Sequence, residues 1–221
     1  MAKEGSRQFQ LRQLVAQQAA RMMAEDGISD YGYAKKKAGR QLGVVDANCL
    51  PSNAEIEEEI RLYHEIYNSD DQPQALRQLR EDALATMQIF DRFNPHLTGS
   101  VLDGTAGQYA ETHIHLFADS AKDVEIFLLN QQIPYESNDK SYRIRDRKAG
   151  DKKGSGKNSE RLKVPMFTLE GPNGFIKLSV FEFDDIRFST KHPASGANAD
   201  RINAAGLQIL LNENSELSCR T

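Results

Sequence analysis

The chain has 221 residues, of which 39% are hydrophobic and 27% charged, and its formal net charge is −4. This length supports one or two domains with a buried core, and the acidic balance argues against a general nucleic-acid-coating protein. Its two cysteines, Cys49 and Cys219, argue against a disulfide framework and favour a reducing compartment. Because no apolar run reaches the length of a membrane span, we expect a cytoplasmic protein with no membrane partner.

Amphipathic helices are predicted throughout the first 95 residues. Apolar residues recur at three- and four-residue spacing over residues 7–25, 29–43, 52–67 and 73–94. Ser52 and Glu55 have the spacing of a capping box, and Pro73 suits the first turn of the next helix. We therefore expect a helical N-terminal region over residues 1–72 and an α/β domain over residues 73–221. The N-terminal helices are expected either to cover one face of the sheet of that domain or to form a separate small bundle.

The pattern changes to short strands after residue 95. Strands are predicted over residues 111–117, 141–146, 162–170 and 175–183, and helices over residues 119–131 and 200–212. The basic, glycine-rich residues 148–158 indicate a loop between two of the strands. Pro165 favours an edge strand or a bulge. Together these elements predict an α+β fold, with a mixed sheet and flanking helices.

The most site-like stretch runs from residue 97 to residue 120. A Gly99-Ser100 turn is followed, after ten residues, by an alternating segment that begins at Glu111. In a strand, side chains alternate between the two faces. The face expected to be buried carries Thr112, Ile114 and Leu116. The other face, expected to be half-exposed, carries Glu111, His113, His115 and Phe117.

This stretch resembles the nucleotidyltransferase superfamily of polymerase-β type over roughly residues 75–185. The family signature is a Gly-Ser or Gly-Gly turn, a short spacer, and two carboxylates flanking one apolar residue on a strand. A third carboxylate follows on a later strand. Here Gly99-Ser100 matches the turn and Glu111 matches the first carboxylate. His113 stands at the second position, and the site-facing candidates for the third are Lys177 and Ser179.

The resemblance implies roles for these residues and a bound nucleotide. Gly99, Ser100 and Lys177 are expected to contact the nucleotide phosphates. Glu111 and His113 are the expected catalytic residues, and Glu111, His113 and His115 are the expected metal ligands. The family uses divalent cations, so Mg²⁺ or Mn²⁺ is implied, with Zn²⁺ as an alternative because imidazoles suit it better.

Several functions stay open at this point. The chain is expected to transfer a nucleotide from a nucleoside triphosphate to an unknown acceptor, such as an RNA or a protein, or to descend from such an enzyme. The alternative is a catalytically inactive nucleotide- or RNA-binding module of the same fold, which Lys177 in place of a carboxylate favours. A small transition-metal site is a third possibility. Two histidines on a half-exposed strand are also compatible with an ordinary polar face.

Overall fold

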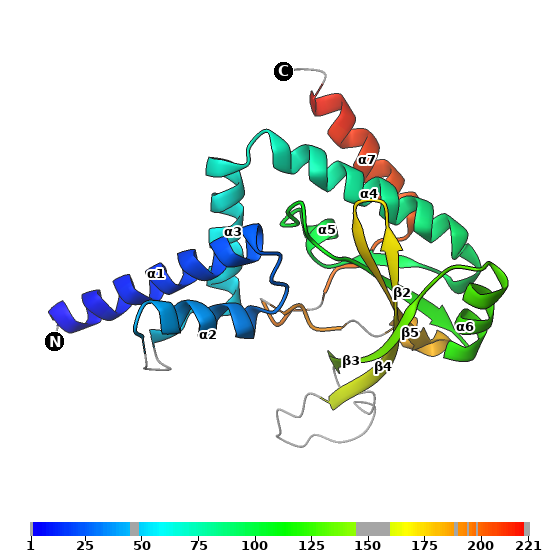
Figure 1. Cartoon of the computed structure of the whole chain (residues 1–221), viewed down its shortest axis with the longest axis horizontal. Coiled ribbons are helices and arrows are strands. Elements are labelled where there is room, and N and C mark those ends of the chain that lie inside the picture. The colour runs from blue at the N-terminus through cyan, green and yellow to red at the C-terminus, as the bar shows by residue number, and fades with distance from the viewer. Residues whose placement is uncertain are drawn as a thin grey trace. The chain divides into compact units, whose positions relative to one another are not determined.

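The computed structural model describes residues 2–44, 49–144, 160–187, 190–193, 195–197 and 199–218 (Figure 1). The chain forms two compact units, and each is described by itself. Unit 1 consists of Met1–Leu76, Gly104–Ala110 and Pro193–Gly196. Unit 2 consists of Arg77–Asp103, Glu111–His192 and Ala197–Thr221. That residues 1–72 and 73–221 are separate domains stays a prediction, and so does the loop at 148–158, which lies outside the described residues.

Three helices build unit 1. They are α1 (Ala2–Glu25), α2 (Tyr31–Gln41) and α3 (Asn53–Tyr67), and α1 packs against both of the others. Asp30 caps α2 by accepting a hydrogen bond from the Tyr33 backbone N–H. The buried residues between the helices are Val15, Ala16, Ala19, Ala20, Met22, Ala34, Ala38, Ile56 and Ile60. The small alanines let the helix axes approach closely, and the predicted helices of this region are confirmed.

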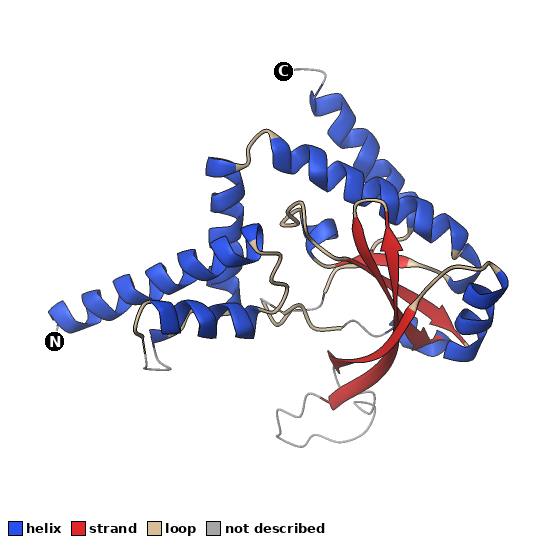
Figure 2. Cartoon of the chain, viewed as in Figure 1, coloured by secondary structure: helices blue, strands red, loops and turns tan. Residues whose placement is uncertain are grey.

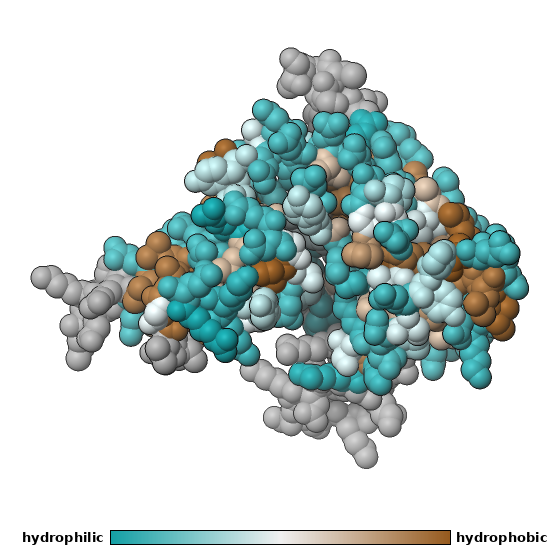
Figure 3. Space-filling model, viewed as in Figure 1, coloured by the Kyte–Doolittle hydropathy of each residue, from teal (hydrophilic) through white to brown (hydrophobic). Residues whose placement is uncertain are grey.

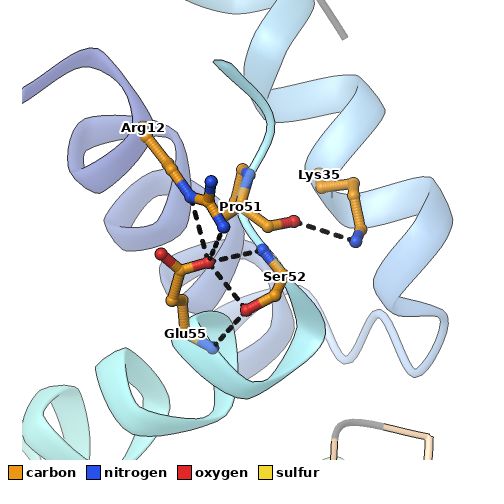
Figure 4. Close-up of polar contacts among 5 residues, drawn as sticks. All are labelled: Arg12, Lys35, Pro51, Ser52 and Glu55. Carbon is orange, nitrogen blue, oxygen red and sulfur yellow. Dashed lines mark hydrogen bonds and ion pairs between the residues drawn. The ribbon is translucent and has the colours of Figure 1, made fainter. Parts of the chain in front are cut away.

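One carboxylate oxygen joins α1 to the start of α3 (Figure 4). Glu55 Oε2 accepts hydrogen bonds from Arg12 Nη2 at 2.7 Å, from the Ser52 backbone N–H at 2.6 Å and from the Ser52 hydroxyl at 2.7 Å. The Ser52 hydroxyl also accepts a bond from the Glu55 backbone N–H, so the predicted capping box is confirmed. Lys35 donates to the Pro51 carbonyl oxygen beside it. The hydrogen bond from Arg12 and those from Ser52 lower the pKa of Glu55 to about 2.

A five-stranded sheet forms the centre of unit 2 (Figure 2). Its strands are β1 (His96–Thr98), β2 (Thr112–Ala118), β3 (Glu136–Ile144), β4 (Glu160–Gly171) and β5 (Gly174–Glu182). The order across the sheet is β1-β2-β5-β4-β3, with β2 and β5 parallel and every other neighbouring pair antiparallel. The predicted α+β class with a mixed sheet is therefore confirmed.

Helices accompany this sheet. They are α4 (Asp71–Ile89), α5 (Ser100–Asp103), α6 (Ala121–Asn130) and α7 (Ala204–Ser218), with short 3₁₀ turns at Asp91–Phe93 and Phe183–Arg187. α6 lies along β2 and β5, and α7 packs against β1. Phe127 of α6 contacts Phe90 and Phe93 with its ring at a steep angle to theirs. Figure 3 shows apolar surface over α6, where Ile126 and Leu129 are exposed.

Several details of unit 2 differ from the sequence-based expectations. β3 begins at Glu136 and not at residue 141, and α4 ends at Ile89 and not at residue 94. β4 lies inside the sheet, but its ladder with β5 begins only at Met166, whereas its ladder with β3 includes Pro165. Pro165 is thus paired with β3 alone and has no partner on the β5 side, which explains how an interior strand tolerates a residue without an N–H. The last helix begins at Ala204 and not at residue 200, because Ile202 forms a bridge with Leu97.

No helix in the described ranges combines the length and apolar character that crossing a membrane requires. The cytoplasmic location stays a prediction.

Candidate functional site

The predicted site residues meet on one face of the unit 2 sheet. His113 of β2 is in register with Lys177 of β5 and with Thr98 of β1, and residues paired in register share a face. Glu111 directly precedes β2 and reaches both neighbours. Its Oε1 lies 2.6 Å from Lys177 Nζ, and its Oε2 lies 3.9 Å from His113 Nε2. The side chains of His113, Glu111 and Lys177 are 19%, 23% and 22% exposed, so the cluster is half-buried.

The His113 ring is neutral in this environment. Burial lowers its pKa to about 3, and the nearby charges of Lys140 and Lys177 add to the effect. Its Nδ1 is buried and has no hydrogen-bond partner among the described residues. The contact between His113 and Glu111 is therefore an interaction of a carboxylate with a neutral imidazole and not an ion pair.

His115 lies deeper than the sequence predicts. Its side chain is 1% exposed, and within the described part of the chain neither ring nitrogen has a hydrogen-bond partner. The ring packs against Phe181, with centroids 4.6 Å apart, and against Tyr142 at 5.3 Å. The expectation that this face of β2 is half-exposed is wrong at His115 and Phe117, because aromatic side chains from β3 and β5 cover it. Burial holds the pKa of His115 well below its usual range.

Tyr142 and Ser179 form a buried hydroxyl pair beside this ring. Their oxygen atoms are 2.7 Å apart, and Ser179 is almost completely buried. Burial raises the pKa of Tyr142 to about 12, and the hydrogen bond with Ser179 opposes the rise. Each of these hydroxyls is thus the hydrogen-bond partner of the other. His115 is held by its contacts with the aromatic rings of Tyr142 and Phe181.

Sequence reasoning missed Lys140 on β3. Lys140 pairs with Val164, which clusters with Phe117 and Phe181 on the His113 face of the sheet. Its Nζ lies 5.3 Å from the centroid of the Tyr142 ring. Burial and, to a smaller extent, the charge of Lys177 lower the pKa of Lys140 to about 8, and Glu111 acts in the opposite direction. The sequence predicted the alternation of residues 141–146, but it did not predict the register between β3 and β4 that places Lys140 on this face.

Arg201 adds a third cation to this face. Its guanidinium lies 5.3 Å from the centroid of the Phe117 ring and donates to the Ile186 carbonyl oxygen at 2.9 Å. Burial lowers its pKa, and its charge contributes to the low pKa of His115. The face therefore combines three cationic side chains with the carboxylate of Glu111.

The glycine turn lies directly against His113. Gly99 has φ +78°, and a Cβ built on it would lie 3.6 Å from His113 Cδ2. Ser100 begins the four-residue helix α5. Arg80, which is 5% exposed, donates to the carbonyl oxygens of Val101 at 2.9 Å and Leu102 at 3.1 Å. A buried guanidinium thus fixes the backbone that follows the turn.

A side-chain hydrogen bond also fixes the C-terminal end of α5. Asp103 Oδ2 lies 2.9 Å from His192 Nε2. The next residues, Gly104–Ala110, belong to unit 1, where Gln72 donates to the carbonyl oxygens of Gly104 and Ala106. Gly99 is therefore the glycine of this loop that the structure shows against His113.

The donors present fit a hard divalent cation poorly. Mg²⁺ and Mn²⁺ prefer oxygen ligands, but the carboxylate of Glu111 is engaged by Lys177, and Lys140 carries a second positive charge nearby. Across the described residues, no three His, Cys, Asp or Glu side chains gather closely enough to hold a metal ion. The predicted metal site at Glu111, His113 and His115, including the Zn²⁺ alternative, stays a prediction.

No protein-family model, curated protein or solved structure matches this chain. The fold defines a mixed α+β protein with a half-buried cationic face on its sheet. That the chain belongs to the nucleotidyltransferase superfamily stays a prediction, which rests on the residues between Gly99 and His113 and on the predicted order of the surrounding elements.

Proposed function

We propose that unit 2 binds a nucleotide through its phosphates, on the sheet face that carries His113 and Lys177. One observation carries the proposal: Lys177 occupies the site-facing position of β5 and is in register with His113. In the family that the sequence resembles, a carboxylate at such a position would hold a metal ion. A lysine there supplies positive charge directly, so a phosphate can be bound without the metal.

The Gly99 turn supports the same proposal. Its positive φ and its lack of a side chain leave the backbone open beside His113. Ser100 supplies a hydroxyl and a backbone N–H at the adjacent position, both of which donate to phosphate oxygens in sites of this kind. A neutral His113 ring donates one N–H without adding charge. These groups together suit an anion better than a cation.

Nucleotidyl transfer is the second candidate. Among the described residues, Glu111 is the acid nearest to His113, with Oε2 3.9 Å from Nε2. This separation is longer than a hydrogen bond, and a carboxylate that closed on this imidazole would orient it to accept a proton from an attacking hydroxyl. The low pKa of His113 makes the ring a weak base near neutral pH. Binding without chemistry is therefore ranked first, and an RNA or a protein remains the acceptor class for the second candidate.

A titration with nucleotides tests the first candidate. ATP, GTP, CTP and UTP are titrated into the full chain by calorimetry, first without metal and then with Mg²⁺ or Mn²⁺. We expect binding without metal, and we expect Lys177→Gln to weaken it by about tenfold or more, the usual cost of losing a charged phosphate contact. Lys163→Gln is the matched control, because Lys163 is an exposed lysine of the same sheet, paired with Asp139.

The outcomes separate the candidates. Absence of binding in every condition, or equal binding by Lys177→Gln and Lys163→Gln, contradicts the proposal. Transfer of label from α-labelled nucleotide to RNA, to protein or to the chain itself supports the second candidate instead. A thermal melt of each variant shows whether a loss of binding reflects a loss of fold.

A further inference from the structure

Lys140 is the second lysine on the face that carries Lys177. The β3–β4 register places it opposite Val164, and Val164 packs with Phe117 and Phe181 on the same side of the sheet as His113. Lys140 therefore faces the site and not the opposite surface. The charge of Lys140 lowers the pKa of His113, and the charge of Lys177 lowers the pKa of Lys140, which places the three side chains in one neighbourhood of this face.

The two lysines share a single carboxylate. Glu111 contacts Lys177 at 2.6 Å. Lys140 has an aromatic partner instead, the Tyr142 ring, and within the described residues no carboxylate lies at ion-pair distance from it. Two half-buried ammonium groups that repel each other, with one carboxylate that acts on both, leave an excess positive charge on this face. Such an arrangement is costly for the protein alone and favourable once an anion binds.

We propose that Lys140 is the second phosphate contact of this face, so that the site selects nucleotides with two or three phosphates over nucleoside monophosphates. This inference rests on the proposed function. Lys177 has three N–H donors, so it can donate to one phosphate group while it keeps its contact with Glu111. A diphosphate or triphosphate reaches Lys140 as well and relieves the repulsion between the two lysines. Charge on the ligand, and not the base, then decides affinity.

A charge series of ligands tests the inference. AMP, ADP and ATP, together with inorganic pyrophosphate and tripolyphosphate, are titrated into the wild-type chain and into Lys140→Gln, Lys140→Arg and Lys163→Gln. We expect affinity in the wild type to rise from AMP to ATP. We expect Lys140→Gln to weaken ATP binding by about tenfold, the cost of one charged hydrogen bond, and to change AMP binding less than about twofold. Lys140→Arg keeps the charge and is expected to retain the preference.

Failure of this inference is distinguishable from failure of the proposed function. If the wild type binds none of the ligands, the proposed function fails and the inference fails with it. If ATP binds and responds to Lys177→Gln, but Lys140→Gln behaves like Lys163→Gln, only the role of Lys140 is overturned. Equal weakening of AMP and ATP by Lys140→Gln overturns the selection by phosphate number. Lys140→Gln is not expected to unfold the chain. The substitution removes a half-buried positive charge that Lys177 repels, and it is therefore expected to stabilise the fold.

Discussion

Lys177 Nζ lies 2.6 Å from Glu111 Oε1, and this contact joins β5 to the residue that precedes its parallel neighbour β2. Both side chains are about one-fifth exposed, so the pair is partly removed from water. The contact neutralises one lysine of the face and thereby sets how much positive charge is available to a ligand. Stability and anion binding therefore respond to Glu111 in opposite directions.

The substitution Glu111→Gln separates these two effects. It leaves Lys177 half-buried without its carboxylate, and the free energy of unfolding is expected to fall by about 1–3 kcal/mol. ATP binding is expected to become tighter, because the face gains net positive charge. Glu182→Gln, an exposed residue at the end of β5, is the matched control. Unfolding in urea and calorimetry with ATP measure the two quantities, and weaker ATP binding by Glu111→Gln would contradict the charge argument.

Lys140 gives the fold a pH dependence in the alkaline range. Its pKa is about 8 in the folded chain, against 10.5 for a free lysine, so the unfolded chain binds more protons between these values. Stability is therefore expected to rise with pH from about 8 towards 10.5 by an amount of order 1–3 kcal/mol. Lys140→Met should remove this rise and be the more stable protein at pH 7. The free energy of unfolding in urea is measured for both proteins at pH 7 and pH 10. An equal change with pH in the two proteins would show that Lys140 is not buried.

Glu55 makes the stability of unit 1 depend on pH in the acidic range. Its pKa is lowered to about 2, so its contribution to stability is complete above about 4.5 and is lost as the pH falls through about 2. Because Arg12 and Glu55 are each about 40% exposed, the contribution is discounted to about 0.5–1 kcal/mol. Glu55→Gln is expected to be less stable than the wild type at pH 7 and equal to it near pH 2. Glu58→Gln, an exposed neighbour, should match the wild type throughout.

The pair Gly99→Ala and Gly43→Ala isolates the role of the glycine turn. Both glycines have positive φ, +78° and +68°, so each substitution is expected to cost about 1–2 kcal/mol of backbone strain. A Cβ at Gly43 meets nothing within 4 Å, whereas one at Gly99 lies 3.6 Å from His113. Thermal melts should therefore fall for both variants, and nucleotide affinity only for Gly99→Ala. If Gly99→Ala and Gly43→Ala bind the nucleotide with equal affinity, the nucleotide does not bind beside Gly99.

Local signals in the sequence predicted the elements well. The capping box at Ser52 and Glu55, the helix that Ser120 caps, and the hairpin between β4 and β5 are each determined by residues close together in the chain. The sequence also predicted the Glu111–His113–Lys177 cluster, because strand alternation and a family resemblance both indicated it. These features needed no knowledge of how distant segments pair.

The rest depends on register between distant strands. His115 is buried because Tyr142 and Phe181 come from β3 and β5, and alternation within β2 contains no information about them. Lys140 faces the site because β3 pairs with β4 in one register, and a shift by a single residue would turn it to the other side of the sheet. The burial of Arg80 likewise depends on a distant segment, because its partners are the carbonyl oxygens of Val101 and Leu102.

The chain passes between the two units at bonds 76–77, 103–104, 110–111, 192–193 and 196–197. Because residues 193–196 belong to unit 1, the helical unit stays incomplete during synthesis until most of unit 2 has left the ribosome. The strands that carry Thr98 and His113 are likewise joined through a segment of the other unit. Neither unit can be excised with a single cut, and a minimal version of the sheet needs residues 104–110 replaced by a designed turn.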